Sequence, residues 1–264
     1  VIVVLASILS MTVFAEGYQV NLLSTKQTGM GHVGTGMKLG AESMHFNPAG
    51  LVFLRTNMDF SLGISAIMAK AKYSYDGYSA KTDNPVGTPL YAYAGFKIYD
   101  NLAAGISLTT PYGNSLKWPK NWAGAGLIQD ISLKSYVIQP TLSYKITDRL
   151  SIGVGLQLAW GNVNLSRALM GASDLQGIGT KFESLLPKLA GVPSSIIPDE
   201  DKKAMQEMVA LMKGTEVPPA YARLEGNAHM RVGFNVGIMY DICDKVTVGL
   251  SYRSKIKMRV KEGE

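Results

Sequence analysis

Long stretches in which apolar residues alternate with small or polar ones constrain the fold of this chain more than any other feature. At 150–160, LSIGVGLQLAW places its apolar side chains on one face and Ser, Gly, Gln and Ala on the other. The same period of two recurs at 231–240 and 246–261, and more briefly near 58–64 and 102–108. This period belongs to β-strands whose two faces meet different surroundings. We therefore predict an all-β, antiparallel fold.

The connections between these strands have two lengths. Tight turns are predicted at Asp100–Asn101, Thr147–Asp148 and Asp241–Asp244, and long connections at 71–88, 111–130 and 164–220. A soluble sandwich also alternates, but short turns that alternate with long loops are typical of an outer-membrane barrel. Several predicted strands also reach the ~9 to 11 residues that cross a bilayer at a tilt. We count about seven strands and, because bacterial single-chain barrels have even strand numbers, expect the sequence to be truncated at both ends.

The N-terminus indicates export. Residues 1–15, VIVVLASILSMTVFA, form an apolar run that ends in small residues, as in a secretory signal peptide whose start is missing. No later window holds eighteen consecutive apolar residues, so no further transmembrane helix is expected. The single cysteine, Cys243, excludes an intramolecular disulfide. A net charge of +6 comes without a recognition motif, so no nucleic-acid partner is expected.

A glycine fingerprint, G-x-G-x-x-G, occurs at Gly29, Gly31 and Gly34. A dinucleotide site would need a buried strand before it and a helix after it. Here the preceding VNLLSTKQT has a polar end, and the following GTGMKLG is too rich in glycine to hold a helix firmly. We interpret the segment as compact backbone that plugs a lumen, and we expect no cofactor.

Several motifs together resemble one family. The segment 16–51, with GMG, an Ala-Glu-Ser stretch and FNPAGL, resembles the N-terminal hatch of the FadL-type outer-membrane transporters of long-chain fatty acids and aromatic hydrocarbons. TPYG at 110–113, LSIGVGLQ at 150–157, GFNVGIMYD at 233–241 and GLSYRSKIKMRVKEG at 249–263 resemble that family's strands and loops in the same order. The resemblance covers nearly all of the chain after residue 15.

The resemblance implies a transmembrane barrel of fourteen strands with a hatch in its lumen, about half of which is present here. Residues 16–55 would be the hatch, and 56–264 a partial barrel with the extracellular loop 164–220. The family's Asn-Pro-Ala motif, which matters for transport, matches Asn47, Pro48 and Ala49, and we add Gly50 as a gating residue. The third strand, 102–110, would carry a kink that opens a lateral gap. Matching residues do not fix the position of this kink, and Gly105 is one possible pivot.

The connection 164–220 has helical signals of its own. DEDKKAMQEMVALMKG has acidic residues in its first turn, a stop at Gly214, and helical spacing of Met205, Met208, Val209 and Met212. Similar spacing relates Ile178, Phe182, Leu185, Leu186 and Leu189, and Pro187 should bend or end that helix. The two faces are expected to pack on each other. Because methionine accepts varied apolar ligands, we name as ligand contacts Phe182, Leu185, Leu186, Met205, Met208 and Met212.

Cations share one face of the last predicted strand: Arg253, Lys255, Lys257, Arg259 and Lys261. They would point inward or lie above the membrane, where Arg253 and Lys255 can attract a fatty-acid carboxylate by charge-assisted hydrogen bonds. The alternative is that these cations bind lipopolysaccharide phosphates or stay solvated.

No enzyme is expected. The histidines His32, His45 and His229 lack metal-ligand spacing, and no G-x-S-x-G elbow occurs. The first functional hypothesis is a monomeric channel in the outer membrane of a Gram-negative bacterium. It would take up hydrophobic molecules passively, with long-chain fatty acids as the first candidate. The alternatives are a structural or adhesive barrel, which would not need Asn47 or Pro48, and a nucleotide-dependent enzyme built on the glycine fingerprint.

Overall fold

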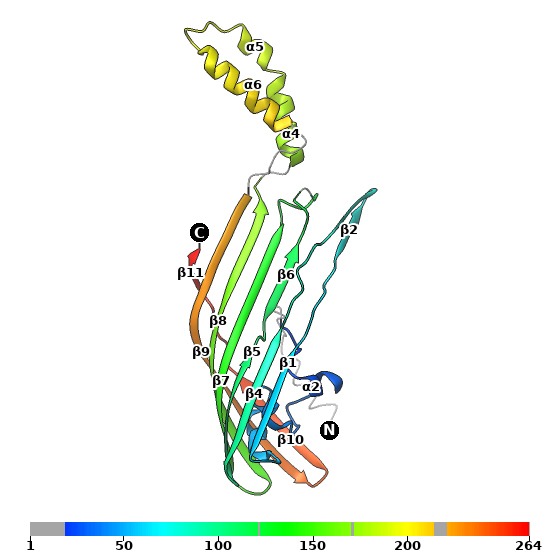
Figure 1. The fold of residues 1–264 in the computed structure, drawn as a ribbon, viewed down its shortest axis with the longest axis vertical. Helices are drawn as coiled ribbons and strands as arrows, with labels where there is room; N and C mark the ends of the chain where they lie inside the picture. Colours follow the sequence, from blue (N-terminus) through cyan, green and yellow to red (C-terminus); the bar gives the residue numbers. More distant parts are fainter. Residues whose placement is uncertain (1–18, 121, 170–171, 214–220, 264) are drawn as a thin grey trace, which may run out of the picture.

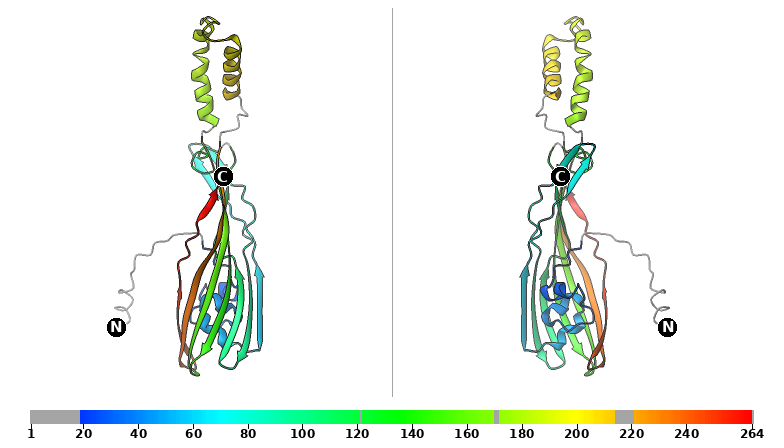
Figure 2. Two further views of the ribbon diagram at one scale, coloured as in Figure 1. Left: turned by 90° about the vertical axis from the view of Figure 1, so that its left-hand side faces the viewer. Right: turned by 90° about the vertical axis from the view of Figure 1, so that its right-hand side faces the viewer.

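The computed structural model describes residues 19–120, 122–169, 172–213 and 221–263. Their strands form a long, curved sheet, and the N-terminal segment, residues 19–57, lies against its concave side (Figures 1 and 2). A helical arm extends beyond the upper ends of the strands (Figure 1). The signal peptide predicted at 1–15 lies outside the described residues.

The main sheet is antiparallel throughout, in the order β1-β4-β5-β7-β8-β9-β10. These strands are β1 (Met58–Ile64), β4 (Leu90–Tyr99), β5 (Leu102–Thr109), β7 (Asp130–Lys145), β8 (Leu150–Ala168), β9 (Tyr221–Cys243) and β10 (Val246–Arg253). Two short strands join from the side: β6 (Gly113–Lys117) pairs with β7, and β11 (Val260–Gly263) pairs with β9. A separate hairpin contains β2 (Lys72–Tyr75) and β3 (Tyr78–Lys81). The antiparallel prediction is confirmed, although the described strands form an open sheet with β1 and β10 at its edges, not a closed barrel.

The turns lie close to their predicted places. Asp100–Asn101 joins β4 to β5, and the turn at 146–149 joins β7 to β8. The third turn is shorter than predicted, because β9 continues through Cys243 and only Asp244 and Lys245 separate it from β10. All three turns lie at the lower end of the sheet in Figure 1, and the longer connections lie at the other end.

The two faces of the sheet are the reverse of those in a soluble protein. On β8, Ile152 and Val154 on the convex face are 41% and 51% exposed, whereas Ser151 and Ala159 on the concave face are 0% and 2% exposed. Small and polar residues thus face the interior, and large apolar side chains face outward. This arrangement suits a wall that has lipid on its outer side.

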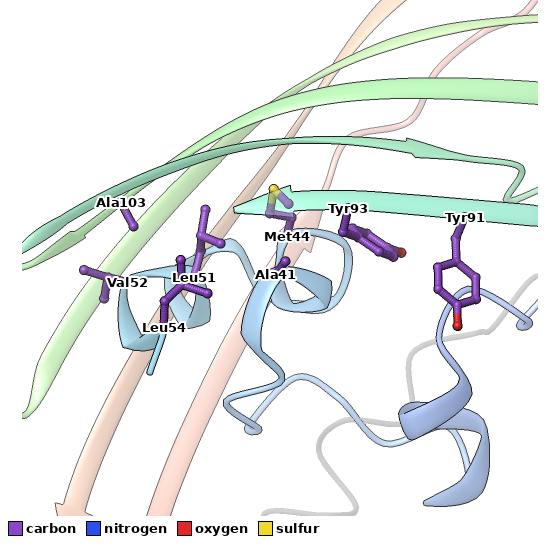
Figure 3. Packing of buried hydrophobic residues seen from close by; sticks show 8 residues of the cluster. All are labelled: Ala41, Met44, Leu51, Val52, Leu54, Tyr91, Tyr93 and Ala103. Carbon is purple, nitrogen blue, oxygen red and sulfur yellow. The ribbon is translucent and has the colours of Figure 1, made fainter. Parts of the chain in front are cut away.

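The N-terminal segment supplies much of the buried core. It contains α2 (Thr25–Gly29), η1 (Gly40–Glu42), α3 (Ser43–Phe46) and η2 (Pro48–Phe53). Met44 and Leu51 from this segment pack with Tyr93 of β4 and Ala103 of β5 (Figure 3). Short helices fit here because each buries a few apolar side chains against the wall while its backbone groups stay paired.

One prediction about the strands is wrong. The alternation at 246–261 does not form one strand, because β10 ends at Arg253 and pairing with β9 resumes only at Val260. Arg253 pairs with Asn235 and Val260 with Ala228, so the register is unchanged across the break. Pro140 lies within β7. The β7–β8 ladder skips Gln139 and Pro140 and resumes in the same register, as expected where a residue has no N–H to donate.

The helical arm contains α4 (Ala172–Glu183), α5 (Leu186–Ala190) and α6 (Asp199–Lys213). Pro187 stands in the first turn of α5, where a missing N–H is tolerated, so the predicted helix ends before it. Gly179 of α4 lies against Met212 of α6, which confirms that the two helices pack together. None of the described helices is long and apolar enough to cross a membrane.

Candidate functional site

The Asn-Pro-Ala-Gly segment lies against the concave face of the sheet. Asn47 is fully buried; its Nδ2 donates to the carbonyls of Thr35 (2.8 Å) and Ile238 (3.1 Å), and its Oδ1 accepts from Ala49 N–H (3.1 Å). Asn47 is therefore the N-cap of η2, and Pro48 follows at a position that needs no N–H donor. One side chain thus joins the segment to itself, to the preceding loop and to β9.

Serines of the wall hold the next carbonyl. The oxygen of Ala49 accepts from Ser143 Oγ of β7 (3.1 Å) and Ser151 Oγ of β8 (2.9 Å). Gly50 lies where a Cβ would be 2.9 Å from Ser43 Cβ, so no larger residue fits without a shift. The four predicted gating residues therefore lie together at the junction of the N-terminal segment and the wall.

Glycines of three adjacent strands let this segment approach closely. A Cβ on Gly153 would lie 2.3 Å from the carbonyl carbon of Pro48, and one on Gly237 would lie 1.9 Å from Asn47 Oδ1. A Cβ on Gly249 would lie 2.0 Å from the oxygen of Thr35. These glycines, which weaken the strand pattern in the sequence, are therefore the points where the backbone of the N-terminal segment contacts the wall.

Three wall side chains converge on the end of α3, just before Asn47. Gln139 Nε2 donates to Met44 O (2.6 Å), and Asn235 Nδ2 to Met44 O (3.3 Å) and His45 O (3.2 Å). Arg253 also donates to His45 O. The His45 ring is buried. This burial is the main reason that the pKa of His45 lies well below its usual value, and the nearby charge of Arg253 is the second, so the ring is neutral.

Above this junction lies a cavity of about 370 Å³ on the concave side, the inner cavity. Arg253 and Lys255 both border it, together with His45, Tyr112, Gln157 and Met258. The structure thus brings together the two cations predicted to bind ligand, although Lys255 follows the end of β10 and is not on a strand. Sequence reasoning missed Gln157 and Met258, because nothing local marks which inward residues border a cavity.

The wall has a gap near the inner cavity. Thr109 pairs with Val137 and Gly113 with Lys134. Residues 110–112 therefore lie opposite only residues 135 and 136 of β7, and the extra residue makes a bulge at 110–112. Among the described strands, β6 pairs with β7 alone. On its other edge, Lys117 exchanges hydrogen bonds with Asp83 and Asn84, and no strand pairs with the rest of that edge in the described chain.

This opening contains a cavity of about 280 Å³, which we call the wall gap. Leu90, Gly113 and Tyr136 line it, and it shares Tyr112, Leu133 and Ser135 with the inner cavity. The N-terminal segment reaches the same place, since Val20 N–H donates to Pro111 O (2.8 Å).

Gly105, the possible pivot of the third-strand kink, is not at this bulge. It pairs regularly with Gly95 and Thr141, and a Cβ there would lie 2.6 Å from Met44 Sδ.

The arm residues lie apart from both cavities, beyond the upper ends of the strands (Figure 1). Met205, Leu186 and Met212 are partly buried, whereas Phe182, Leu185 and Met208 are 45%, 45% and 56% exposed. Met208 therefore lies outside the packed face, contrary to the prediction, and Val209 is buried in it. The structure does not bring these residues together with Arg253 or Lys255.

The glycine fingerprint has no cofactor geometry. Gly29 is the last residue of the five-residue helix α2, and Gly31 adopts a positive φ of 72° in the following turn. A Cβ on Gly34 would lie 2.7 Å from Phe46 Cγ. A dinucleotide turn instead precedes a helix in a parallel sheet, whereas every pairing in the described strands is antiparallel.

The chain resembles known proteins over nearly its whole length. It matches the family model described as "Outer membrane protein transport protein (OMPP1/FadL/TodX)" over residues 6–264. The long-chain fatty acid transport protein of Escherichia coli K12 is 24% identical over 264 residues, which cover 98% of this chain and 56% of that protein. That of Salmonella typhi is 25% identical over 98% of this chain and 54% of its own length. The chain thus spans about half the length of these relatives.

Solved structures share the fold. A Pseudomonas aeruginosa FadL homologue has a TM-score of 0.58 at 18% identity, covering 91% of this chain and 53% of its own. The Pseudomonas putida toluene transporter TodX has a TM-score of 0.55 at 21% identity, covering 83% of this chain and 52% of its own. The antiparallel sheet and the family model agree: this chain belongs to the FadL/TodX family of outer-membrane transport proteins of Gram-negative bacteria, whose members are not enzymes.

Proposed function

We propose that the protein is a passive uptake channel for hydrophobic molecules, with long-chain fatty acids as its first substrates. The observation that carries this proposal is that the inner cavity and the wall gap are neighbours that share three lining residues, Tyr112, Leu133 and Ser135. The printed names of the relatives, fatty acid transport proteins and a toluene transporter, support the substrate class.

The proposed route has three parts. Exposed apolar residues of the arm, such as Phe182 and Met208, capture the ligand outside the cell. The ligand then enters the inner cavity above Asn47 and leaves sideways through the wall gap into the membrane, after the N-terminal hatch rearranges. Apolar burial supplies ~0.8 kcal/mol per methylene, so affinity should rise about fourfold for each carbon of the ligand chain.

In the same proposal, the described sheet is about half of a fourteen-stranded barrel that closes through β1 and β10. Closure is needed because an unpaired N–H or C=O that faces lipid costs several kcal/mol. The barrel is a monomer, and the partners of its outer surface are outer-membrane lipid and lipopolysaccharide. The apolar convex face supports the contact with lipid.

Filling the wall gap tests the exit route. A Cβ on Gly113 would be 3.5 Å from its nearest neighbour, Leu133 O, which is ordinary contact, so Gly113→Trp should fill the gap without forcing the backbone apart. We expect uptake of labelled hexadecanoate by cells without other transporters to fall roughly tenfold or more. Gly126→Trp is the matched control, because a Cβ there is 3.8 Å from its nearest neighbour and Gly126 does not line the gap. Equal uptake by the two variants would contradict lateral exit.

The alternative is a structural or adhesive barrel whose long loops bind other surfaces. It requires neither a conducting cavity nor the buried hydrogen bonds of Asn47. If full-length protein carrying Asn47→Ala and Pro48→Ala folds in the outer membrane and transports hexadecanoate as the wild type does, the hatch is not a gate and the hatch step of the proposed route fails. Loss of uptake with retained folding would instead exclude the adhesive alternative.

A further inference from the structure

Gln157 of β8 has an acceptor atom that the described residues leave without a donor. The residue is 3% exposed and borders the inner cavity, and its Oε1 is buried with no hydrogen-bond partner among the described residues. A buried acceptor without a donor is costly, and native structures rarely keep one unless a ligand or water completes it. The inner cavity therefore has a place for a group that donates a hydrogen bond.

A chain of side-chain amides fixes which atom of Gln157 is left over. Gln139 Nε2 donates to Met44 O (2.6 Å), and a carbonyl oxygen can only accept, so Gln139 must present its NH₂ group there. Gln139 Oε1 then accepts from Gln157 Nε2 (2.9 Å). Turning the Gln157 amide over would bring two acceptor oxygens together. The atom left over is therefore the oxygen, and the group that it binds must carry a hydrogen.

The other residues of the inner cavity narrow the chemistry of that group. Arg253 and Lys255 border the cavity, and Arg253 Nε is also buried without a partner among the described residues. These two cations disfavour an ammonium donor, and a carboxylate has no hydrogen to give to Gln157. A neutral hydroxyl group can donate to Gln157 Oε1 while its own oxygen still accepts. Ile256 and Met258 line the same cavity, so a hydrocarbon chain can lie beside the hydroxyl.

We propose that the inner cavity binds the hydroxyl group of a long-chain alcohol, which donates to Gln157 Oε1. This inference rests on the proposed channel function and adds long-chain alcohols to the fatty acids named there. Gln139 is a positioning residue, because it acts by holding the Gln157 amide in one orientation. A site built around a hydroxyl group rejects analogues that lack one, because the buried partner of that group is then left unpaired.

Two isomers test this inference. Full-length protein purified from outer membranes is loaded with tritiated 1-hexadecanol, and unlabelled 1-hexadecanol or 1-methoxypentadecane is added as a competitor. The two competitors contain the same atoms, but the ether oxygen carries no hydrogen. We expect the alcohol to compete roughly tenfold better or more, as is typical when a buried acceptor loses its donor.

Substitutions at position 157 separate the acceptor from the amide chain. Gln157→Met and Gln157→Glu both lose the hydrogen bond to Gln139, but only Gln157→Glu keeps an acceptor. We expect Gln157→Met to remove the preference for the alcohol and Gln157→Glu to retain it. Gln139→Met frees the Gln157 amide to turn and should reduce the preference by a smaller factor. Gln129→Met is the matched control, because Gln129 is also a buried glutamine but does not line the inner cavity.

The outcomes separate this inference from the channel proposal. Equal competition by the two isomers in the wild type, or an alcohol that does not bind, would overturn the hydroxyl site, while uptake of hexadecanoate would still support the channel. A Gln157→Met variant that keeps the full preference would show that water satisfies Gln157, and one that loses both isomers by the same factor would show a structural role only. Either result also overturns the inference. Absent hexadecanoate uptake with a retained preference for the alcohol would instead contradict the channel alone.

Discussion

Gly153→Ala should lift the hatch from the wall. The new Cβ would lie 2.3 Å from the Pro48 carbonyl carbon and 2.4 Å from Ala49 N, where ordinary contact begins at 3.4 Å. Both neighbours are backbone atoms, so neither can swing away. The segment must move by about 1 Å, which strains the bonds of Ala49 O to Ser143 (3.1 Å) and Ser151 (2.9 Å). Overpacking and the weakened hydrogen bonds together should cost about 2–5 kcal/mol.

Gly155→Ala is the matched control on the same strand and face. A Cβ there would lie 2.5 Å from Gln139 Nε2, the end of a flexible side chain, which can turn aside. Gln139 would then lose its hydrogen bond to Met44 O, but Met44 O keeps the one from Asn235 Nδ2. The two variants therefore add the same methyl group two residues apart but meet different obstacles. Only the first should displace the hatch.

Thiol labelling reports the difference. Val52 of η2 is 2% exposed, so Val52→Cys is protected from maleimide while the hatch is seated; the exposed Cys243 is first replaced by serine. A loss of 2 kcal/mol corresponds to a roughly 30-fold faster labelling rate. Gly153→Ala should reach at least that factor, and Gly155→Ala should stay near the parent. Equal protection in the two variants would refute the argument that the hatch rests on Gly153.

Three further predictions concern the hatch and the arm. Asn47→Ala removes three hydrogen bonds of a fully buried residue and should raise the ion leak of the protein in planar bilayers; an unchanged conductance would mean that the cap is dispensable. Because the pKa of His45 is lowered in the folded state, hatch protection should be complete above pH 6.5 and decline as the pH falls below it. His45→Gln should flatten that profile, and a profile that stays equally steep would exclude His45 as its source. In the arm, Val209→Ser should speed hydrogen exchange of α6, whereas Met208→Ser should leave exchange unchanged and lower ligand capture; the reverse result would reassign the two faces.

The candidate site was predictable only in part. FNPAGL identified residues at the junction of the N-terminal segment and the wall, and the alternating cations predicted that Arg253 points inward or lies above the membrane. The acceptor of Arg253 could not be predicted, because His45 lies 208 residues away and offers a backbone carbonyl, which every residue has. A lateral gap near the third strand was expected from the family resemblance, but its position could not be predicted for a related reason: a bulge at 110–112 depends on how many residues the neighbouring strand contributes. The sequence of one strand does not contain that number.

The break after β10 shows the same limit. The alternation of VTVGLSYRSKIKMRV continues to Val260, yet the chain leaves the ladder at Ser254, whose Oγ accepts from Phe234 N–H. Ile256 then occupies the space beside Gly233: a Cβ on Gly233 would lie 2.5 Å from Ile256 Cγ1. A glycine on the neighbouring strand therefore leaves the room that the separated chain occupies. No pattern within 246–261 marks the position.

The sequence by itself determined which residues lie on the outward apolar face and which face the interior, where the tight turns lie, and that the long connection before β9 is helical. These features depend on period and local chemistry, which the chain expresses residue by residue. The tertiary structure decided how the N-terminal segment meets the wall, which arginine Nε atoms have no hydrogen-bond partner among the described residues, and where the wall opens. Those features depend on pairs of residues that are distant in the sequence and meet across the sheet. A glycine allows such a close contact only if another backbone lies next to it, and the sequence does not say which backbone that is.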